Sequence, residues 1–139
     1  MAEKKCAHTT RISIRWGDMD ALGHVNNTVY FRYMEQARID CMTSIGLLGA
    51  KPLEEGPVIV NANCTFIKPL RYPGIVEIQT YVRPPSRSSF EISHRIYRAD
   101  TPDVIAAEGS AKVVWVNYRL ERSIPLSDEI RKCLQDATL

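Results

Sequence analysis

The pattern of hydrophobic and polar residues predicts one strand, one long helix, four more strands and a short last helix. From Arg11 to Trp16 polar and apolar residues alternate, which is typical of a half-buried strand. From Thr28 to about Ile45 no Gly or Pro interrupts the chain, and apolar residues recur every three or four positions. The apolar face of this helix is broad, so we expect a curved sheet to cover it, in an α+β fold.

Four further strands are expected, over residues 58–68, 75–83, 89–98 and 104–118. The three turns that connect these four strands are rich in Pro, Gly and Asp. They are too short for crossover helices, so neighbouring strands must run antiparallel. Asn26 or Asn27 is placed to cap the long helix and Gly46 to end it. Ser127 is placed to cap a short last helix over residues 128–135.

Composition narrows the class of protein. The 139 residues, 45% of them hydrophobic, suit a single domain over residues 1–139. The net charge is only +2 and no Lys/Arg block is long, so we expect no nucleic-acid partner. Neither a signal peptide nor a membrane span is expected. The four cysteines form no CxxC pair, which argues against a zinc site or a disulfide scaffold and favours a reduced, cytoplasmic location.

The segment before the long helix carries the candidate chemistry. Asp18, Asp20, His24, Asn26 and Asn27 crowd into this one turn. A helix N-terminus presents unpaired backbone N–H groups and a partial positive charge, and so can polarise a carbonyl. A carboxylate nearby could attack that carbonyl or activate a water molecule. We therefore expect a catalytic site at this turn.

Other interpretations of the turn were weighed on the residues alone. A calcium loop is disfavoured because Leu22 occupies a ligand position and Val29 the place of the bidentate Glu. A phosphatase-like Asp-x-Asp nucleophile would need an apolar strand that ends at Asp18, but Gly17 intervenes. The polar residues could also serve only as turn and cap residues, and spacing alone leaves this alternative open.

The segment resembles the signature of the hotdog-fold thioesterases of the 4-hydroxybenzoyl-CoA and short-chain acyl-CoA thioesterase type. The residues that form the signature are Asp18, Asp20, Gly23, His24, Val25, Asn26, Asn27 and Tyr30. The likeness continues through residues 33–38 and 66–70 and covers nearly the whole chain. It implies one helix wrapped by a five-stranded antiparallel sheet, which pairs with a second subunit into a dimer-wide sheet with active sites at the interface.

The resemblance also implies roles for particular residues. Asp20 matches the catalytic carboxylate, and a backbone N–H near Asn27 matches the group that polarises the thioester carbonyl. Glu35 matches a position that reads the polar end of the substrate, although an ion pair with an arginine of the partner fits equally, and Tyr30 joins the substrate-binding set. His24 is auxiliary or structural, because Leu22 stands where related plant acyl-carrier-protein thioesterases have an Asn.

The basic residues offer candidates for binding the phosphates of coenzyme A. Arg83 and Arg87 flank the turn Pro84-Pro-Ser86, and Ser88 could assist them. A solvated charged face is the other interpretation of this cluster. His8, His94 and the four cysteines are predicted to be structural, since the pattern places His94, Cys41 and Cys64 on apolar faces and no cysteine has a base beside it in the sequence.

The prediction is therefore a thioester hydrolase that acts on acyl-CoA or acyl-carrier-protein thioesters as a homodimer or dimer of dimers. It needs no metal or organic cofactor. Whether Asp20 attacks the thioester or deprotonates a water molecule stays open. One alternative is a hotdog hydratase or dehydratase, which needs a different spacing of Asp and His. The other is a non-catalytic acyl-thioester binding module, which would lack the carboxylate.

Overall fold

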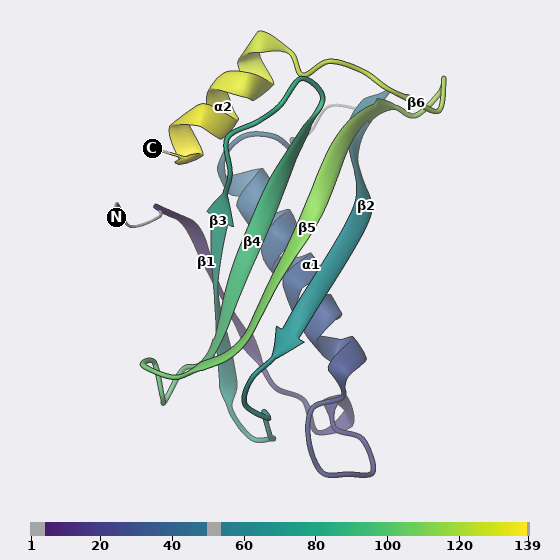
Figure 1. Cartoon of the computed structure of the whole chain (residues 1–139). Coiled ribbons are helices and arrows are strands. Elements are labelled where there is room, and N and C mark those ends of the chain that lie inside the picture. The colour runs from purple at the N-terminus through teal and green to yellow at the C-terminus, as the bar shows by residue number, and fades with distance from the viewer. Residues whose placement is uncertain (1–4, 50–53, 139) are drawn as a thin grey trace.

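The computed structural model describes residues 5–49 and 54–138 and confirms the α+β class (Figure 1). The elements in chain order are β1 (Cys6–Ser13), a 3-10 helix (Trp16–Asp18), α1 (Asn27–Ser44), β2 (Glu55–Phe66), β3 (Ile75–Val82), β4 (Ser89–Arg98), β5 (Ile105–Asn117), β6 (Arg122–Ser123) and α2 (Asp128–Thr138). The long helix, the four later strands and the last helix were all predicted.

The strands form one antiparallel sheet in the order β1-β3-β4-β5-β2, with the short β6 paired to β5. In Figure 1 α1 lies along one face of this sheet, and α2 lies at the end where α1 finishes. The turn formed by residues 18–27, the candidate site, lies at the opposite end, where α1 begins. Strand β2 is an edge strand, so one side of its backbone pairs with no other strand among residues 5–49 and 54–138.

The core lies between α1 and the sheet because the buried face of α1 repeats with helical spacing. Its members are Tyr30, Tyr33, Met34, Ala37 and Cys41, which pack over the inward-facing residues of β3, β4 and β5. Gly109 on β5 permits this close packing, since a Cβ atom there would collide with the Met34 sulfur and the Asn63 carbonyl. The predicted alternation along β3 and β4 therefore corresponds to a real inside and outside.

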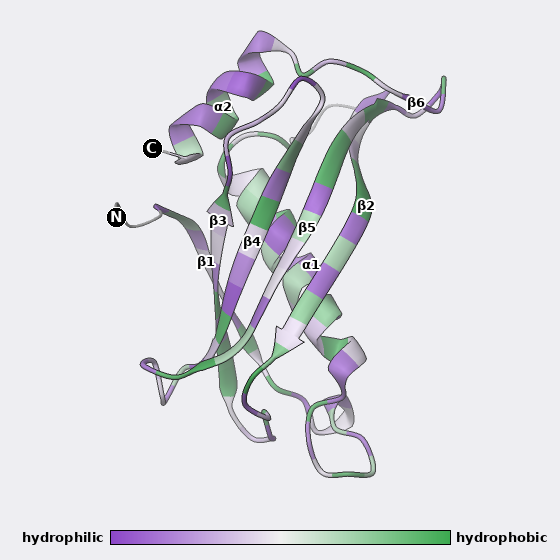
Figure 2. Ribbon diagram, viewed as in Figure 1, coloured by the Kyte–Doolittle hydropathy of each residue, from purple (hydrophilic) through white to green (hydrophobic). Residues whose placement is uncertain are grey.

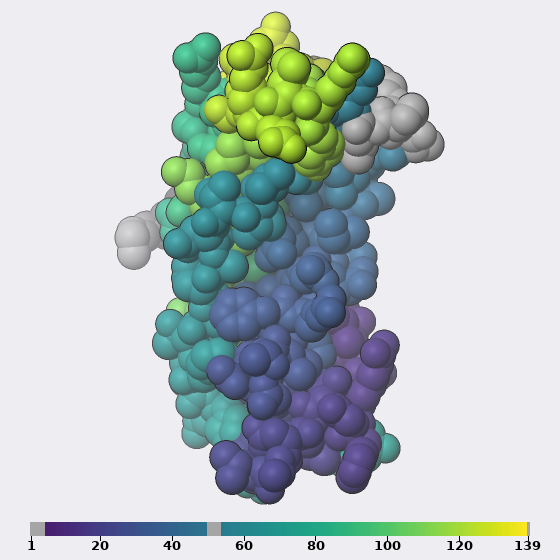
Figure 3. Space-filling model, turned by 90° about the vertical axis from the view of Figure 1, so that its right-hand side faces the viewer, coloured from purple at the N-terminus to yellow at the C-terminus, as the bar shows by residue number. Residues whose placement is uncertain are grey.

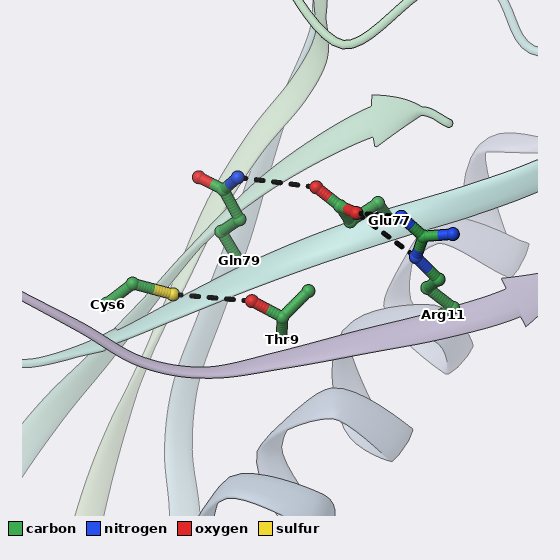
Figure 4. A network of polar contacts seen from close by, with 5 residues as sticks. All are labelled: Cys6, Thr9, Arg11, Glu77 and Gln79. Atoms are coloured by element: carbon green, nitrogen blue, oxygen red, sulfur yellow. Dashed lines mark hydrogen bonds and ion pairs between the residues drawn. The ribbon is translucent and has the colours of Figure 1, made fainter. Parts of the chain in front are cut away.

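The outward face of the sheet is polar, as the alternating colours along the strands in Figure 2 indicate. Figure 4 shows one network on this face: Arg11 of β1 donates to Glu77 of β3 at 2.9 Å, and Gln79 donates to the same carboxylate. Such exposed ion pairs contribute little stability. The fold is thus stabilised mainly on the inner face, which α1 covers.

Several element bounds differ from the prediction. The first strand is β1, and Trp16, predicted to face inward, is 74% exposed. The reason is local: the Asp18 carboxylate accepts a hydrogen bond from the Arg15 N–H at 2.9 Å, which turns the chain out of the sheet into the 3-10 helix. Strand β6 was not predicted, because two residues carry no periodic pattern. Helix α2 continues to Thr138, past the predicted end.

Candidate active site

The catalytic turn, residues 18–27, is a compact loop held against the neighbouring segment 67–74. The Val25 N–H donates to the Leu70 carbonyl at 2.8 Å, and Met19 pairs with Val25 in an isolated antiparallel bridge. Gly23 has a φ of 82°, a conformation that favours glycine, and its N–H closes the turn on the Asp20 carbonyl at 3.0 Å. The backbone therefore holds this turn in one conformation.

Asp20 is half-buried, and both of its carboxylate oxygens are hydrogen-bonded. Oδ1 accepts from the Leu22 N–H at 2.9 Å, and Oδ2 accepts from the Asn26 side-chain amide at 3.1 Å. Each hydrogen bond uses one lone pair of its carboxylate oxygen and leaves that oxygen a second lone pair. The carboxylate is thus oriented without being fully occupied, as a nucleophile or general base requires.

Asn26 joins the carboxylate to the start of α1. Its Oδ1 atom caps the helix by accepting from the Thr28 N–H at 2.9 Å, while its Nδ2 atom donates to Asp20. The sequence pattern predicted Asn26 as a possible cap, but the hydrogen bond to Asp20 was not predicted. A side-chain amide both accepts and donates hydrogen bonds. A cap Asn close to a turn Asp was therefore the feature of the sequence that could have indicated the second bond.

Asp18 has a structural position and is not a second free carboxylate. Its Oδ2 atom accepts from the Arg15 N–H and from the Tyr33 hydroxyl, at 2.9 and 2.7 Å. Burial and the bond to Asp18 raise the pKa of Tyr33 well above its usual value, so this hydroxyl stays a donor. Asp18 therefore clamps the turn to the buried face of α1.

A pocket of about 280 Å³ opens beside the start of α1. It is lined by His24, Val25, Asn27, Tyr30, Phe66, Ile67, Lys68 and Pro69. As the first residue of α1, Asn27 has a backbone N–H with no intrahelical acceptor. The structure therefore brings together the predicted carbonyl-polarising position, His24 and Tyr30.

Tyr30 and Phe66 form the apolar wall of this pocket. Their rings meet edge to face with centroids 5.0 Å apart. Phe66 is 46% exposed and supplies the accessible surface of this wall, whereas Tyr30 is 3% exposed and packs behind it. Burial raises the pKa of Tyr30, so the phenol remains neutral. The wall suits an apolar or aromatic acyl group.

Other predicted residues lie away from this turn. Glu35 is exposed on α1 and pairs with Arg32 at 3.1 Å. Arg83, Arg87 and Ser88 lie at the far end of the sheet: β3 begins beside the catalytic turn and ends at Val82, roughly 25 Å away at strand rise. Within one protomer these three residues therefore do not meet Asp20.

The remaining candidate groups match their structural interpretation. Burial raises the pKa of Cys41 to about 12 and that of Cys64 to about 11, so neither thiol is a nucleophile near neutral pH.

Among residues 5–49 and 54–138, no group of His, Cys, Asp or Glu is arranged to hold a metal ion. In the same part of the chain, no helix is long and apolar enough to cross a membrane.

The fold agrees with the comparisons with known proteins. Residues 14–134 match the model of the thioesterase-like superfamily. The chain belongs to this family, and it is a hotdog-fold thioester hydrolase.

Individual relatives show the same likeness. The solved structure of the PA2801 protein of Pseudomonas aeruginosa is 41% identical, with a TM-score of 0.81 over 91% of this chain and 96% of that one. The 1,4-dihydroxy-2-naphthoyl-CoA hydrolase of Picosynechococcus is 26% identical over 94% of both chains. The chloroplastic acyl-acyl carrier protein thioesterase ATL3 of Arabidopsis thaliana is 24% identical over 89% of this chain and 65% of that protein.

Proposed function

We propose that this enzyme hydrolyses acyl-CoA thioesters at the catalytic turn, with Asp20 as the reacting carboxylate. The observation that carries the proposal is the link through Asn26, whose one side chain orients Asp20 and caps the helix that presents the Asn27 N–H. The carboxylate and the group that polarises the carbonyl are thereby held in one rigid unit. Thioester hydrolysis needs both parts.

Two routes use this geometry. In the first, an Asp20 oxygen attacks the thioester carbon, the C–S bond breaks, coenzyme A leaves as thiolate, and water hydrolyses the resulting mixed anhydride. In the second, Asp20 takes a proton from a water molecule, whose oxygen attacks the same carbon and expels the thiolate. In both, the Asn27 N–H donates to the developing oxyanion. A rapid-quench mass measurement that finds an acyl-enzyme would assign the first route.

The acyl group is proposed to lie against Tyr30 and Phe66. Phe66 offers exposed apolar surface with Tyr30 packed behind it, and a relative, the 1,4-dihydroxy-2-naphthoyl-CoA hydrolase, is named for an aromatic acyl group. A carrier-protein thioester is the second candidate substrate, favoured by the likeness to the Arabidopsis acyl-carrier-protein thioesterase. Rates on aromatic and aliphatic acyl-CoA, and on the same acyl groups carried by acyl carrier protein, separate these candidates.

We further propose a homodimer that pairs the two β2 edges. The edge exposes Val58, Val60 and Phe66, and long exposed apolar edges are normally paired or covered. Figure 3 shows the teal atoms of β2 beside the blue atoms of α1, with the purple atoms of the catalytic segment below them on the same face. A second copy on this edge would therefore also border the site.

The dimer explains the distant arginines. A twofold axis that pairs β2 antiparallel with its copy inverts the partner, so the far end of one protomer meets the catalytic end of the other. Arg83, Arg87 and Ser88 of one subunit would then serve the Asp20 site of its partner, as contacts to the coenzyme A phosphates. The predicted cytoplasmic location stays a prediction.

Asp20→Asn tests the chemistry, because it removes the carboxylate and keeps the volume and shape. We expect kcat to fall by roughly a hundredfold or more, with only a small fall in melting temperature, because the amide nitrogen of Asn cannot accept one of the two hydrogen bonds that the carboxylate accepts. The measurement is steady-state hydrolysis of acyl-CoA by the purified variant. Wild-type turnover by Asp20→Asn would contradict the assignment.

A mixed dimer tests the shared site. Co-expressed Asp20→Asn and Arg87→Ala chains form a heterodimer in which one site has an intact Asp20 and an intact Arg87 only if these residues come from different subunits. Activity with wild-type KM is therefore expected in the heterodimer and absent from both parent dimers. Light scattering that finds a monomer at micromolar concentration would overturn the dimer, and a heterodimer without low-KM activity would overturn the shared site.

A further inference from the structure

Arg71 reaches His24 across two neighbouring backbone segments. The Val25 N–H donates to the Leu70 carbonyl at 2.8 Å, which lays residues 24–25 beside residues 70–71. Leu70 is buried, so this pairing is anchored in the core. From there the Arg71 Nη2 atom lies 2.9 Å from the His24 Nε2 atom.

The chemistry of the two groups decides where the proton of His24 lies. A guanidinium group only donates hydrogen bonds and does not lose its proton in proteins. The Nε2 atom must therefore accept, so it carries no hydrogen, and the neutral ring carries its hydrogen on Nδ1. A protonated Nε2 would place two donors against each other at 2.9 Å.

We infer that Arg71 is a positioning residue that holds His24 in the neutral Nδ1–H tautomer, so that His24 acts in the pocket as a hydrogen-bond donor and not as a base. The role of His24 as a donor to the substrate rests on the proposed function. The tautomer of the His24 ring does not depend on it.

Arg71 is itself held in place. Its carbonyl accepts from Arg98 Nη1 at 2.7 Å, and Arg98 is also paired with Asp100 at 2.9 Å. Within residues 5–49 and 54–138, no carboxylate lies within ion-pair distance of the Arg71 guanidinium. The hydrogen bond to His24 is thus not shared with an acidic side chain.

The consequence for the site is a pocket equipped with donors. His24 and Asn27 both line it, and Asn27 contributes a backbone N–H at the helix start. A thioester oxygen accepts hydrogen bonds and cannot donate them, so an N–H from His24 suits the substrate as well as the developing oxyanion. Asp20 is then left as the one carboxylate that serves as nucleophile or base.

Nitrogen NMR of the imidazole rings tests the assignment directly. The chain has three histidines, so His24→Gln identifies the His24 signals in a 15N-labelled sample. In the wild-type protein we expect His24 to show a protonated Nδ1 and an unprotonated Nε2. Arg71→Met should move the ring toward the Nε2–H form, and Arg71→Lys, which retains a donor, should restore the wild-type pattern.

Lys68→Met is the matched control, since Lys68 is a cation of the same pocket but has no hydrogen bond to His24. It should leave the tautomer unchanged, and the tautomer is the readout for which it serves as control. Arg71→Met should also lower kcat/KM for acyl-CoA, by roughly tenfold for a lost site donor. A wild-type ring protonated on Nε2, or a ring that does not respond to Arg71→Met, would overturn the inference. If wild-type protein shows the expected tautomer but hydrolyses no thioester, the proposed function alone is overturned.

Discussion

Two histidines in this small fold have opposite environments. His24 lies at the surface of the catalytic turn, half-buried, with its Nε2 atom bonded to Arg71. His94 lies on β4 beneath α1, 2% exposed, with Nδ1 bonded to Thr80 at 3.0 Å and Nε2 without a partner in the described structure. One ring has a polar partner and an open pocket; the other is enclosed in the core with an unsatisfied nitrogen.

The difference shows that the hydrogen-bond partner of a histidine and its degree of burial together determine what the side chain can do. At the catalytic turn each polar group is oriented by another: Tyr33 by Asp18, Asp20 by Asn26, and His24 by Arg71. In the core, burial dominates: it lowers the pKa of His94 to about 3, with a further contribution from the nearby Arg38. The turn is arranged for chemistry, whereas His94 carries a cost in stability.

The largest effect should appear in acid. The unfolded chain takes up a proton on His94 near pH 6.5, and the native protein only near pH 3, so the free energy of unfolding falls as pH drops through this window. This loss, of order 3–5 kcal/mol, is absent above pH 6.5. Chemical denaturation between pH 7 and pH 4 should show it.

The double variant His94→Leu with Thr80→Val replaces both partners of the buried hydrogen bond with apolar side chains of similar shape. Its free energy of unfolding should depend less steeply on pH than that of the wild type. Equal slopes in the double variant and the wild type would mean that His94 does not titrate differently in the two states.

A smaller effect is expected at Asn26, where orientation of Asp20 can be separated from helix capping. Serine retains a cap oxygen for the Thr28 N–H but lacks the amide that donates to Asp20. Asn26→Ser should lower kcat by roughly tenfold while the melting temperature changes little.

Asn26→Ala removes both bonds and serves as the comparison. It should add a loss of stability of about 1 kcal/mol to the loss of kcat. Wild-type turnover in Asn26→Ser would show that Asp20 is oriented without this amide. The two variants thus separate the chemical part of the turn from its structural part.

The smallest effect should come from Arg87, which is exposed and far from the chemistry of its own protomer. Removing a phosphate contact should weaken ground-state and transition-state binding alike, so Arg87→Ala should raise KM for acyl-CoA by a factor of about 3–10 with kcat nearly unchanged. The increase should shrink as salt rises. A KM equal to that of the wild type at low salt would exclude Arg87 from the phosphate site.

Local patterns in the sequence determined most of the fold. Helical spacing between Thr28 and Ile45 and alternation along residues 75–83 and 89–98 correspond to α1, β3 and β4, because each pattern repeats with the geometry of its element. The first strand was displaced because the Asp18 carboxylate, through a local bond to the Arg15 N–H, ends it early. The alternation of polar and apolar residues alone gives no sign of such a competing hydrogen bond.

The motif likewise predicted the turn at residues 18–27 as the candidate site, whereas only the tertiary structure decided how its groups are paired. Residues 70–71 come to lie beside His24 only when the strands assemble, so the bond from Arg71 has no signature in the sequence around either residue. The same holds for the far position of Arg83 and Arg87, which depends on the length and direction of β3 within the sheet. Local propensity acts over a few neighbours, while a site is completed by contacts between segments that packing brings together.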